Sequence, residues 1–293
     1  MVPMKNTFLL IMMTFLSIIV FAQEEQARWT PTIGLQSDIV PIYNIVGADT
    51  SYSNAFSIAP SFSIRNAAGW GITYSPKLLP GTSGPFIFMH AVTVGVEQYD
   101  KKIIDYSLNY NHYFFTGNRS VPYSPLNNEI SGSLAWKTMW IHPIIEAGVG
   151  FGKDTSSGKN SYVDDIAVVL GAGHSFKLYK DSSIDVTVSP ALLLNSGTND
   201  YFSFLTITKY IGHGQNSLKF LKNGHENKSG GNGKNNASGS SFAVSNIEAR
   251  LETSVELGNW ALRPDASLYF PVGKYSGTRV YGYWQVTLTY SFY

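Results

Sequence analysis

The stretch VYGYWQVTLTYSF, from Val280 to Phe292, decides the fold because its residues alternate strictly between two kinds. One face carries mainly apolar side chains, among them Trp284 and Leu288, and the other carries polar ones such as Gln285. A period of two residues is that of a β-strand, whose successive side chains point to opposite faces. The stretch therefore predicts a strand with one face suited to lipid and the other suited to water.

The same alternation recurs along the chain in segments that are long for a globular protein. Their length often exceeds roughly 10 residues, enough for a tilted strand to cross a membrane, whereas globular strands average about 5–6. Three of the apolar faces read Phe56, Ile58, Pro60, Phe62 and Ile64; Ile104, Tyr106, Leu108, Tyr110 and Phe114; and Ile184, Val186, Val188, Pro190, Leu192 and Leu194.

The breaks between these segments alternate between short and long. Short breaks fall at 66–68, 100–102, 139–141, 179–181 and 258–259, and longer polar breaks fall at 41–52, 80–85, 116–128, 153–161, 196–241 and 271–277. Short turns at one end and long loops at the other indicate about twelve antiparallel strands. A strand-like stretch at 201–210, inside the longest break, keeps fourteen strands open as an alternative, and ten is the other.

Composition places the chain outside the cytoplasm and beside lipid. Residues 1–22 have a basic start, an apolar run and a small residue before a polar one, which predicts a cleaved signal peptide. The remaining domain, 23–293, is formally neutral without Lys5, which argues against nucleic-acid binding. Charged residues make up 14% of the chain, against about a quarter in a typical soluble domain. The absence of cysteine excludes disulfides, thiolate metal sites and a cysteine nucleophile.

These features together resemble the general class of Gram-negative outer-membrane β-barrel proteins, over Trp29 to Tyr293. The resemblance implies an all-β fold, a single transmembrane antiparallel up-and-down β-barrel, integral in the outer membrane with both termini in the periplasm. It also implies contact with outer-membrane lipids, including lipopolysaccharide, and recognition of the C-terminal strand by the barrel-assembly machinery. Such barrels usually end in an aromatic residue on the apolar face; here that residue is Phe292, and Tyr293 is appended after it.

A strip of charged residues is predicted to face the lumen from the last long hairpin. A two-residue turn at 258–259 places Glu252 opposite Asp265, so that acids and bases neutralise one another. Charges on the lipid face would cost about 2–4 kcal/mol near the midplane, so the strip must face inward. It either forms a constriction that orients a small polar solute or braces the lumen, and the bracing role is preferred. The strip comprises Glu248, Arg250, Glu252, Glu256, Arg263 and Asp265.

A second lumenal feature is a strip of glycines on two neighbouring strands. Glycine lets another chain segment approach closely or lets a strand bend. The long loop at 196–241 is therefore expected either to fold against the strip or to be unrelated to it. The strip comprises Gly148, Gly150, Gly152, Gly171 and Gly173.

Two histidines fall on the predicted lipid face near the loop end of the barrel. A three-residue turn at 100–102 would place His90 opposite His112, where the pair either contacts lipid phosphate or forms part of an amphipathic girdle. The other histidines, His142, His174, His213 and His225, show no spacing of a metal site. No catalytic residue, metal or cofactor is predicted.

Three functions are compatible with this pattern. The first is a porin-like channel for small polar or ionic solutes, without enzymatic activity. The second is an occluded structural or interaction barrel that binds a secretion or surface partner through its loops. The third is an outer-leaflet lipid-modifying enzyme using His90 or His112 with a nucleophile.

Overall fold

The computed structural model describes residues 29–46, 49–80, 86–99, 101–116, 126–154, 161–181, 183–198, 242–273, 276 and 280–292. The predicted signal peptide and the strand-like stretch at 201–210 lie outside the described residues. Within the described ranges, no helix is long and apolar enough to cross a membrane.

The described chain is built from strands. They are β1 (Trp29–Val46), β2 (Asp49–Asn66), β3 (Trp70–Leu79), β4 (Phe86–Gln98), β5 (Ile104–Phe115), β6 (Asn128–Trp136), β7 (His142–Asp154), β8 (Ser161–Gly173), β9 (Phe176–Lys180), β10 (Ile184–Gly197), β11 (Ala243–Leu257), β12 (Trp260–Pro271) and β13 (Tyr281–Ser291).

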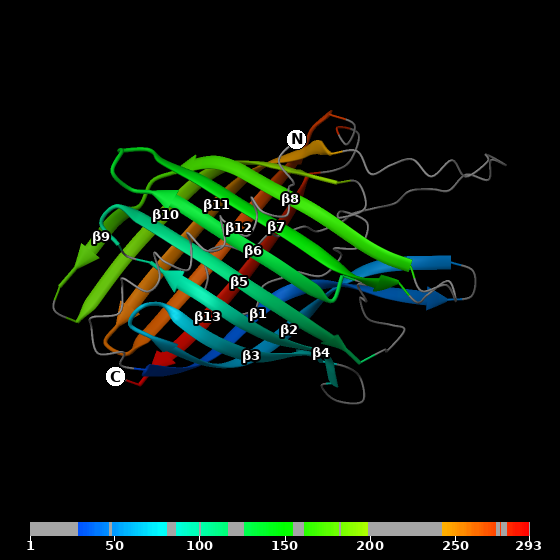
Figure 1. Cartoon of the computed structure of the whole chain (residues 1–293), viewed down its shortest axis with the longest axis horizontal. Helices are drawn as coiled ribbons and strands as arrows, with labels where there is room; N and C mark the ends of the chain where they lie inside the picture. Colours follow the sequence, from blue (N-terminus) through cyan, green and yellow to red (C-terminus); the bar gives the residue numbers. More distant parts are fainter. Residues whose placement is uncertain are drawn as a thin grey trace, which may run out of the picture.

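Twelve of these strands close into one antiparallel barrel, and β9 is an extra short strand (Figure 1). Consecutive strands pair along the chain, except that β8 pairs with β10 and not with β9, and β13 pairs with β1. The strand β8 pairs with residues 191–197 of β10, and β9 pairs with residues 185–188 of the same strand. The predicted up-and-down barrel of about twelve strands is confirmed.

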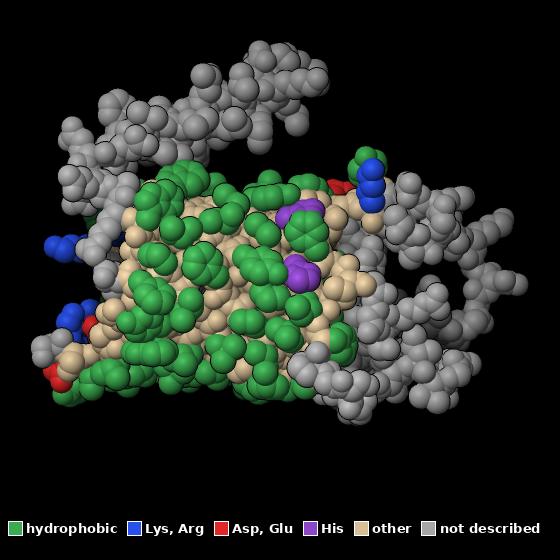
Figure 2. Space-filling model, turned by 90° about the horizontal axis from the view of Figure 1, so that it is seen from below, with side chains coloured by type: hydrophobic (Ala, Val, Ile, Leu, Met, Phe, Trp, Pro, Cys, Tyr) green, Lys and Arg blue, Asp and Glu red, His purple; other side chains and the backbone are tan. Residues whose placement is uncertain are grey.

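The outer face of the barrel is apolar and exposed. Phe62, Leu108 and Leu268, from three different strands, are 52%, 48% and 51% exposed. Figure 2 shows a broad band of hydrophobic side chains on the face in view, with coloured Lys, Arg, Asp and Glu side chains only toward its two ends. An apolar surface of this extent faces lipid rather than water.

The two ends of the barrel differ, as predicted. The turn end carries the connections 67–69, 99–103, 137–141, 181–183 and 258–259, and the loop end carries the longer ones together with the short β1–β2 connection at 47–48. The first and last described residues both lie at the turn end, where the Phe292 backbone N–H donates to the Pro31 carbonyl oxygen at 2.9 Å. The turn at 258–259 has Gly258 at φ +57°, a left-handed conformation that favours glycine.

Three predicted breaks differ from the structure. Residues 41–52 are not a loop, because β1 and β2 stay paired up to Val46 and Asp49 and only 47–48 lie between them. The break at 100–102 is longer, with Gln98 opposite Tyr106 as the last pair of β4 and β5. The turn expected at 179–181 lies at 181–183, because β9 extends to Lys180. At 41–52 the pairing of β1 with β2 continues through Pro41 and the polar residues that follow it.

The first prediction tests the lipid face. Leu108→Arg, in the middle of β5, should lower the free energy of unfolding by about 2–4 kcal/mol, because the guanidinium would enter hydrocarbon. Ile103→Arg, at the turn end and 57% exposed, should cost about 0–1 kcal/mol. Urea unfolding in lipid vesicles, followed by tryptophan fluorescence, measures both, and equal costs would contradict the assignment of the band.

The second prediction concerns Asp181, which closes the β9–β10 turn. Its carboxylate accepts the backbone N–H groups of Ser183 and Ile184, both at 2.7 Å, and the Tyr179 hydroxyl at 2.9 Å. These hydrogen bonds, that of Ser183 first, lower the pKa of Asp181 from 3.8 to about 2. Because the folded-state pKa is depressed, the stabilisation is present above pH 3.8 and is lost as the pH falls through about 2. An NMR titration of the Asp181 carboxyl carbon should have its midpoint near 2, and a midpoint near 3.8 would contradict the turn geometry.

Candidate functional site

The candidate site is the inner wall of the barrel, and its register in the last long hairpin is the predicted one. Leu257 pairs with Trp260 across the two-residue turn, and Glu252 pairs with Asp265. Alternation therefore turns Glu248, Arg250 and Glu252 of β11 inward.

Arg250 is the centre of this wall. Its guanidinium donates to Glu146 at 2.7 Å and to Glu248 at 2.8 Å, and it lies 3.7 Å from Glu252. The side chains of Arg250, Glu146 and Glu248 are 3%, 2% and 1% exposed. We call Arg250 with Glu146, Glu248 and Glu252 the Arg250 cluster.

Glu146 was not predicted as a partner of Arg250. It lies on β7, separated from β11 by β8 and β10 along the sheet. The ion pair therefore joins parts of the wall that are not neighbours. Only the alternation along β7 indicated that Glu146 faces inward, because it stands on the same face of this strand as Gly148 and Gly150.

Small residues occupy the wall between these two partners. Arg250 lies opposite Ala191, which lies opposite Gly173. A methyl group on Gly171 would lie 2.4 Å from both the Leu192 carbonyl oxygen and the Leu193 side chain. We infer that glycine on β8 allows the close approach of β10.

The remaining glycines of the predicted strip lie on β7. Gly148 and Gly150 are buried, and Gly152 is partly buried. The inward folding of the long loop against them concerns residues 199–241, which lie outside the described residues.

A second buried cluster was missed by the sequence analysis. The Lys77 ammonium, on β3, lies 2.6 Å from the Asp38 carboxylate, on β1, and both residues are almost fully buried. Asp38 also accepts hydrogen bonds from Ser57, from Gln36 at 3.2 Å and from the Tyr283 hydroxyl at 3.2 Å. An ion pair this deep inside the wall is stabilised by its additional hydrogen bonds.

The Asp38–Lys77 cluster extends through β13 to β12. The Gln285 side chain accepts from the Tyr283 hydroxyl at 3.0 Å and donates to Asp265 at 3.1 Å. Asp265 lies opposite Glu252 of the Arg250 cluster in the sheet. Polar contacts therefore run along the inner face from Lys77 on β3 to Asp265 on β12, next to the Arg250 cluster.

The predicted strip of six charges divides into two parts. Arg263 pairs with Glu256 at 3.3 Å near the turn end, and their side chains are 37% and 46% exposed. They do not belong to the buried Arg250 cluster. The six charges therefore stand at two levels of the inner face, one deeply buried in the middle of the wall and one half-exposed near the turn end.

Acidic side chains outnumber basic ones on the described inner face of the twelve barrel strands. The acids are Asp38, Glu97, Asp105, Glu129, Glu146, Asp165, Asp185, Glu248, Glu252, Glu256 and Asp265, and the bases are Arg65, Lys77, Arg250 and Arg263. The wall is therefore electronegative in sum.

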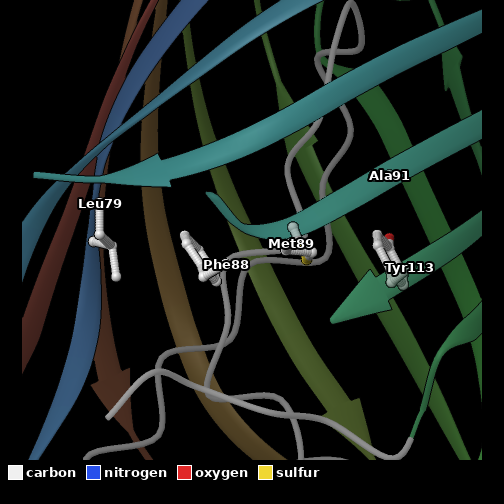
Figure 3. Close-up of a cluster of buried hydrophobic side chains, with 5 residues drawn as sticks. All are labelled: Leu79, Phe88, Met89, Ala91 and Tyr113. Carbon is white, nitrogen blue, oxygen red and sulfur yellow. The ribbon is translucent and has the colours of Figure 1, made fainter. Parts of the chain in front are cut away.

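An apolar cluster interrupts the polar inner face near the loop end. It consists of Leu79, Phe88, Met89, Ala91 and Tyr113, all buried (Figure 3). Tyr113 connects it to the polar wall, because its hydroxyl donates to Glu129 at 2.7 Å.

Solved structures with a similar barrel were found, although the sequence matches no family model and no curated protein. The NanC porin is 8% identical, with 90% of this chain and 99% of that chain covered and a TM-score of 0.40. LpxR from Salmonella typhimurium is 8% identical, with 88% and 99% covered and a TM-score of 0.42. The translocator domain of the autotransporter NalP from Neisseria meningitidis is 9% identical, with 99% and 97% covered and a TM-score of 0.36.

The chain has the fold of outer-membrane β-barrel proteins. Likenesses at this level of identity concern the fold alone. Any function of the barrel must therefore be inferred from its own residues.

The two histidines of the predicted lipid face are not opposite each other. His90 pairs with Phe114 and His112 pairs with Val92, because the longer β4–β5 connection shifts the register by two residues. His90 Nδ1 lies 2.7 Å from the Tyr74 hydroxyl, and His112 Nδ1 lies 2.8 Å from Asn128 Oδ1. Neither partner is a serine or an acid, the groups that the enzyme hypothesis requires.

His142 and His174, which were not predicted to be neighbours, lie side by side at the turn end. Their ring centroids lie 5.2 Å apart. Among the described residues, no three His, Cys, Asp or Glu side chains converge as a metal site would require.

The third prediction compares the two arginines. Arg250→Met should lower the free energy of unfolding by about 3–5 kcal/mol, because it leaves buried carboxylates without their cation. Arg263→Met should cost about 1 kcal/mol or less, because its ion pair is half-exposed. Urea unfolding in vesicles separates the two, and equal costs would show that the Arg250 cluster is not buried as described.

Proposed function

We propose that the protein is a narrow outer-membrane pore for small cations and small polar solutes. The observation that carries this proposal is the contact of Arg250 with Glu146 across two intervening strands. A side chain that reaches from β11 to β7 narrows the lumen at that level. Such a constriction admits small solutes and excludes large ones.

The charge of the wall gives the proposed preference for cations. The inner face carries more acids than bases, and rings of carboxylates favour cations in pores. Part of this charge is neutralised locally, by Lys77 at Asp38 and by Arg250 within its cluster. The net excess of carboxylates acts on a solute that passes these clusters.

The orientation and partners follow from the same proposal. The turn end, with both described chain ends, faces the periplasm, as short turns do in this class of protein. The apolar band contacts outer-membrane lipids, including lipopolysaccharide in the outer leaflet. The C-terminal strand, with Phe292 on its apolar face, is recognised by the barrel-assembly machinery during insertion.

A second candidate function is a closed barrel that acts through its ends. The near-complete burial of Lys77, Glu146 and Glu248 favours it, because side chains along an open water-filled path are exposed. The apolar cluster around Phe88 and Met89 supports it as well. In this case the loops or turns bind a partner in secretion or at the cell surface.

The fourth prediction separates the two candidates. Residues 23–293, refolded and inserted in a planar bilayer, should give a small steady single-channel conductance, and the reversal potential in a KCl gradient should show cation preference. Arg250→Ala should raise both the conductance and the cation preference, because it removes the side chain that crosses the lumen and its positive charge. Glu146→Gln, which weakens the same contact with little change in volume, should raise the conductance as well.

The matched control is Arg263→Ala, whose ion pair lies at the rim and is half-exposed. It should leave the conductance almost unchanged. All chains are checked for folding by the shift of their gel mobility on heating. If the folded wild type and all folded variants conduct no current, the pore is excluded and the closed barrel becomes the function to pursue.

A further inference from the structure

A group of polar side chains interrupts the apolar outer face of β5 and β6 near the loop end. The Tyr110 hydroxyl donates to the Asn128 side-chain oxygen at 2.8 Å, and His112 Nδ1 lies 2.8 Å from the same oxygen. Figure 2 shows histidine side chains among the hydrophobic ones, toward one end of the band. Polar groups that face lipid are costly, so a hydrogen-bonded cluster on this face is a candidate binding site.

The hydrogen bonds of Asn128 fix the ring of His112. The Asn128 amide nitrogen donates to the Phe151 carbonyl oxygen at 3.3 Å, so the amide oxygen faces His112 and accepts from it. His112 Nδ1 therefore carries a proton. The ring also packs edge-on against Phe114, with centroids 4.3 Å apart. The second nitrogen, Nε2, is then the atom that can meet a ligand, and in the imidazolium form it donates to an anion.

A shallow apolar groove lies on the same outer face, next to this cluster on its turn-end side. It holds about 370 Å³, and its lining includes Leu108 of β5, Ile130, Gly132 and Leu134 of β6, and Ala147 of β7. Gly132 pairs with both Leu108 and Ala147, so two small residues form the floor of the groove. Ile130 is two residues from Asn128 and shares its face of the strand, so the groove and the polar cluster are continuous.

A lysine stands on the other side of the cluster. Lys153 is exposed on the outer face of β7, two residues beyond Phe151, which pairs with Asn128. Its ammonium lies 5.0 Å from the centre of the Tyr162 ring, so the side chain follows the outer surface. Among the described residues of β4 to β8, Asp164 is the one acid on the outer face, and it lies on β8, one strand farther from the groove than Lys153. The cation is therefore closer to the groove than the acid is.

We propose that this surface binds one molecule of lipopolysaccharide, the phosphorylated acyl lipid of the outer leaflet. An acyl chain lies in the groove, and a phosphate of the headgroup is held by His112 Nε2 and the Lys153 ammonium. An apolar groove that leads to hydrogen-bond donors and a cation near the membrane surface is complementary to an anionic lipid. The inference rests on the proposed orientation, which turns the loop end outward. It does not depend on the pore, because the site lies on the outside of the barrel.

The fifth prediction is that the refolded chain 23–293, in non-ionic detergent micelles, binds one molecule of lipid A, the phosphorylated acyl part of lipopolysaccharide. Native mass spectrometry over a series of lipid A concentrations gives the number bound and the dissociation constant. Ala147→Leu should weaken binding about tenfold, because its side chain fills the groove. His112→Phe and Lys153→Met should each weaken it about tenfold as well, because each removes a donor to the phosphate.

Matched controls change the same kinds of residue elsewhere on the barrel. Ala266→Leu, on the outer face of β12, and Lys102→Met, at the turn end, should bind lipid A as tightly as the wild type. Lipid A without its phosphates should bind the wild type about tenfold more weakly. All chains are checked for folding by the shift of their gel mobility on heating.

Three results would overturn the proposal. They are unchanged binding in folded Ala147→Leu, equally tight binding of lipid A without phosphates, and tighter binding of phosphatidylglycerol than of lipid A. Ala147→Leu should conduct as the wild type does in a planar bilayer, because residue 147 faces away from the lumen. A failure of the lipid site and a failure of the pore are therefore separate results.

Discussion

The structure depends on one constraint: inside a bilayer, every backbone N–H and C=O group must find its partner within the protein. A sheet meets this requirement only when its edges join, and here β13 joins β1 while β10 joins β11 and β8. Closure forces every strand to have one face toward lipid and one toward the lumen. The alternation of apolar and polar residues, the apolar band and the buried polar wall are all consequences of that closure.

A closed barrel of this size must also fill or hydrate its interior. The wall does so with ion pairs that are themselves hydrogen-bonded, the Arg250 cluster on one side and Asp38 with Lys77 on the other. Tyr283 and Gln285 extend the second of these as far as Asp265, which lies opposite Glu252 of the first. These ion pairs join different strands of the wall, and the contact of Arg250 with Glu146, which reaches over two intervening strands, also sets the narrowest level of the proposed pore. Bracing and constriction are therefore two effects of the same side chains.

The sequence predicted the strands, their inward and outward faces and the register of β11 with β12, because these follow from local patterns. A two-residue turn with glycine determines which residues pair on either side of it. Where a connection is longer, as between β4 and β5, the centre of the turn is harder to predict. A small error in that centre led to the prediction that His90 and His112 pair, whereas His112 pairs with Val92.

Contacts between strands that are not consecutive could not be predicted. The ion pair of Arg250 with Glu146, that of Lys77 with Asp38, and the approach of His142 to His174 depend on the tilt and stagger of the whole barrel. No segment of the chain encodes these by itself. Alternation along the strand could have restricted the candidates for Glu146, since it shares the inward face of β7 with Gly148 and Gly150.

Arg250 and Glu146 hold the wall together from β11 to β7. A double-mutant cycle of Arg250→Met and Glu146→Gln, measured by urea unfolding in vesicles, tests this contact directly. We expect the two substitutions to be strongly non-additive, with a coupling free energy of about 1–3 kcal/mol. Additive costs would show that the two side chains do not meet and would contradict the contact that joins β11 to β7.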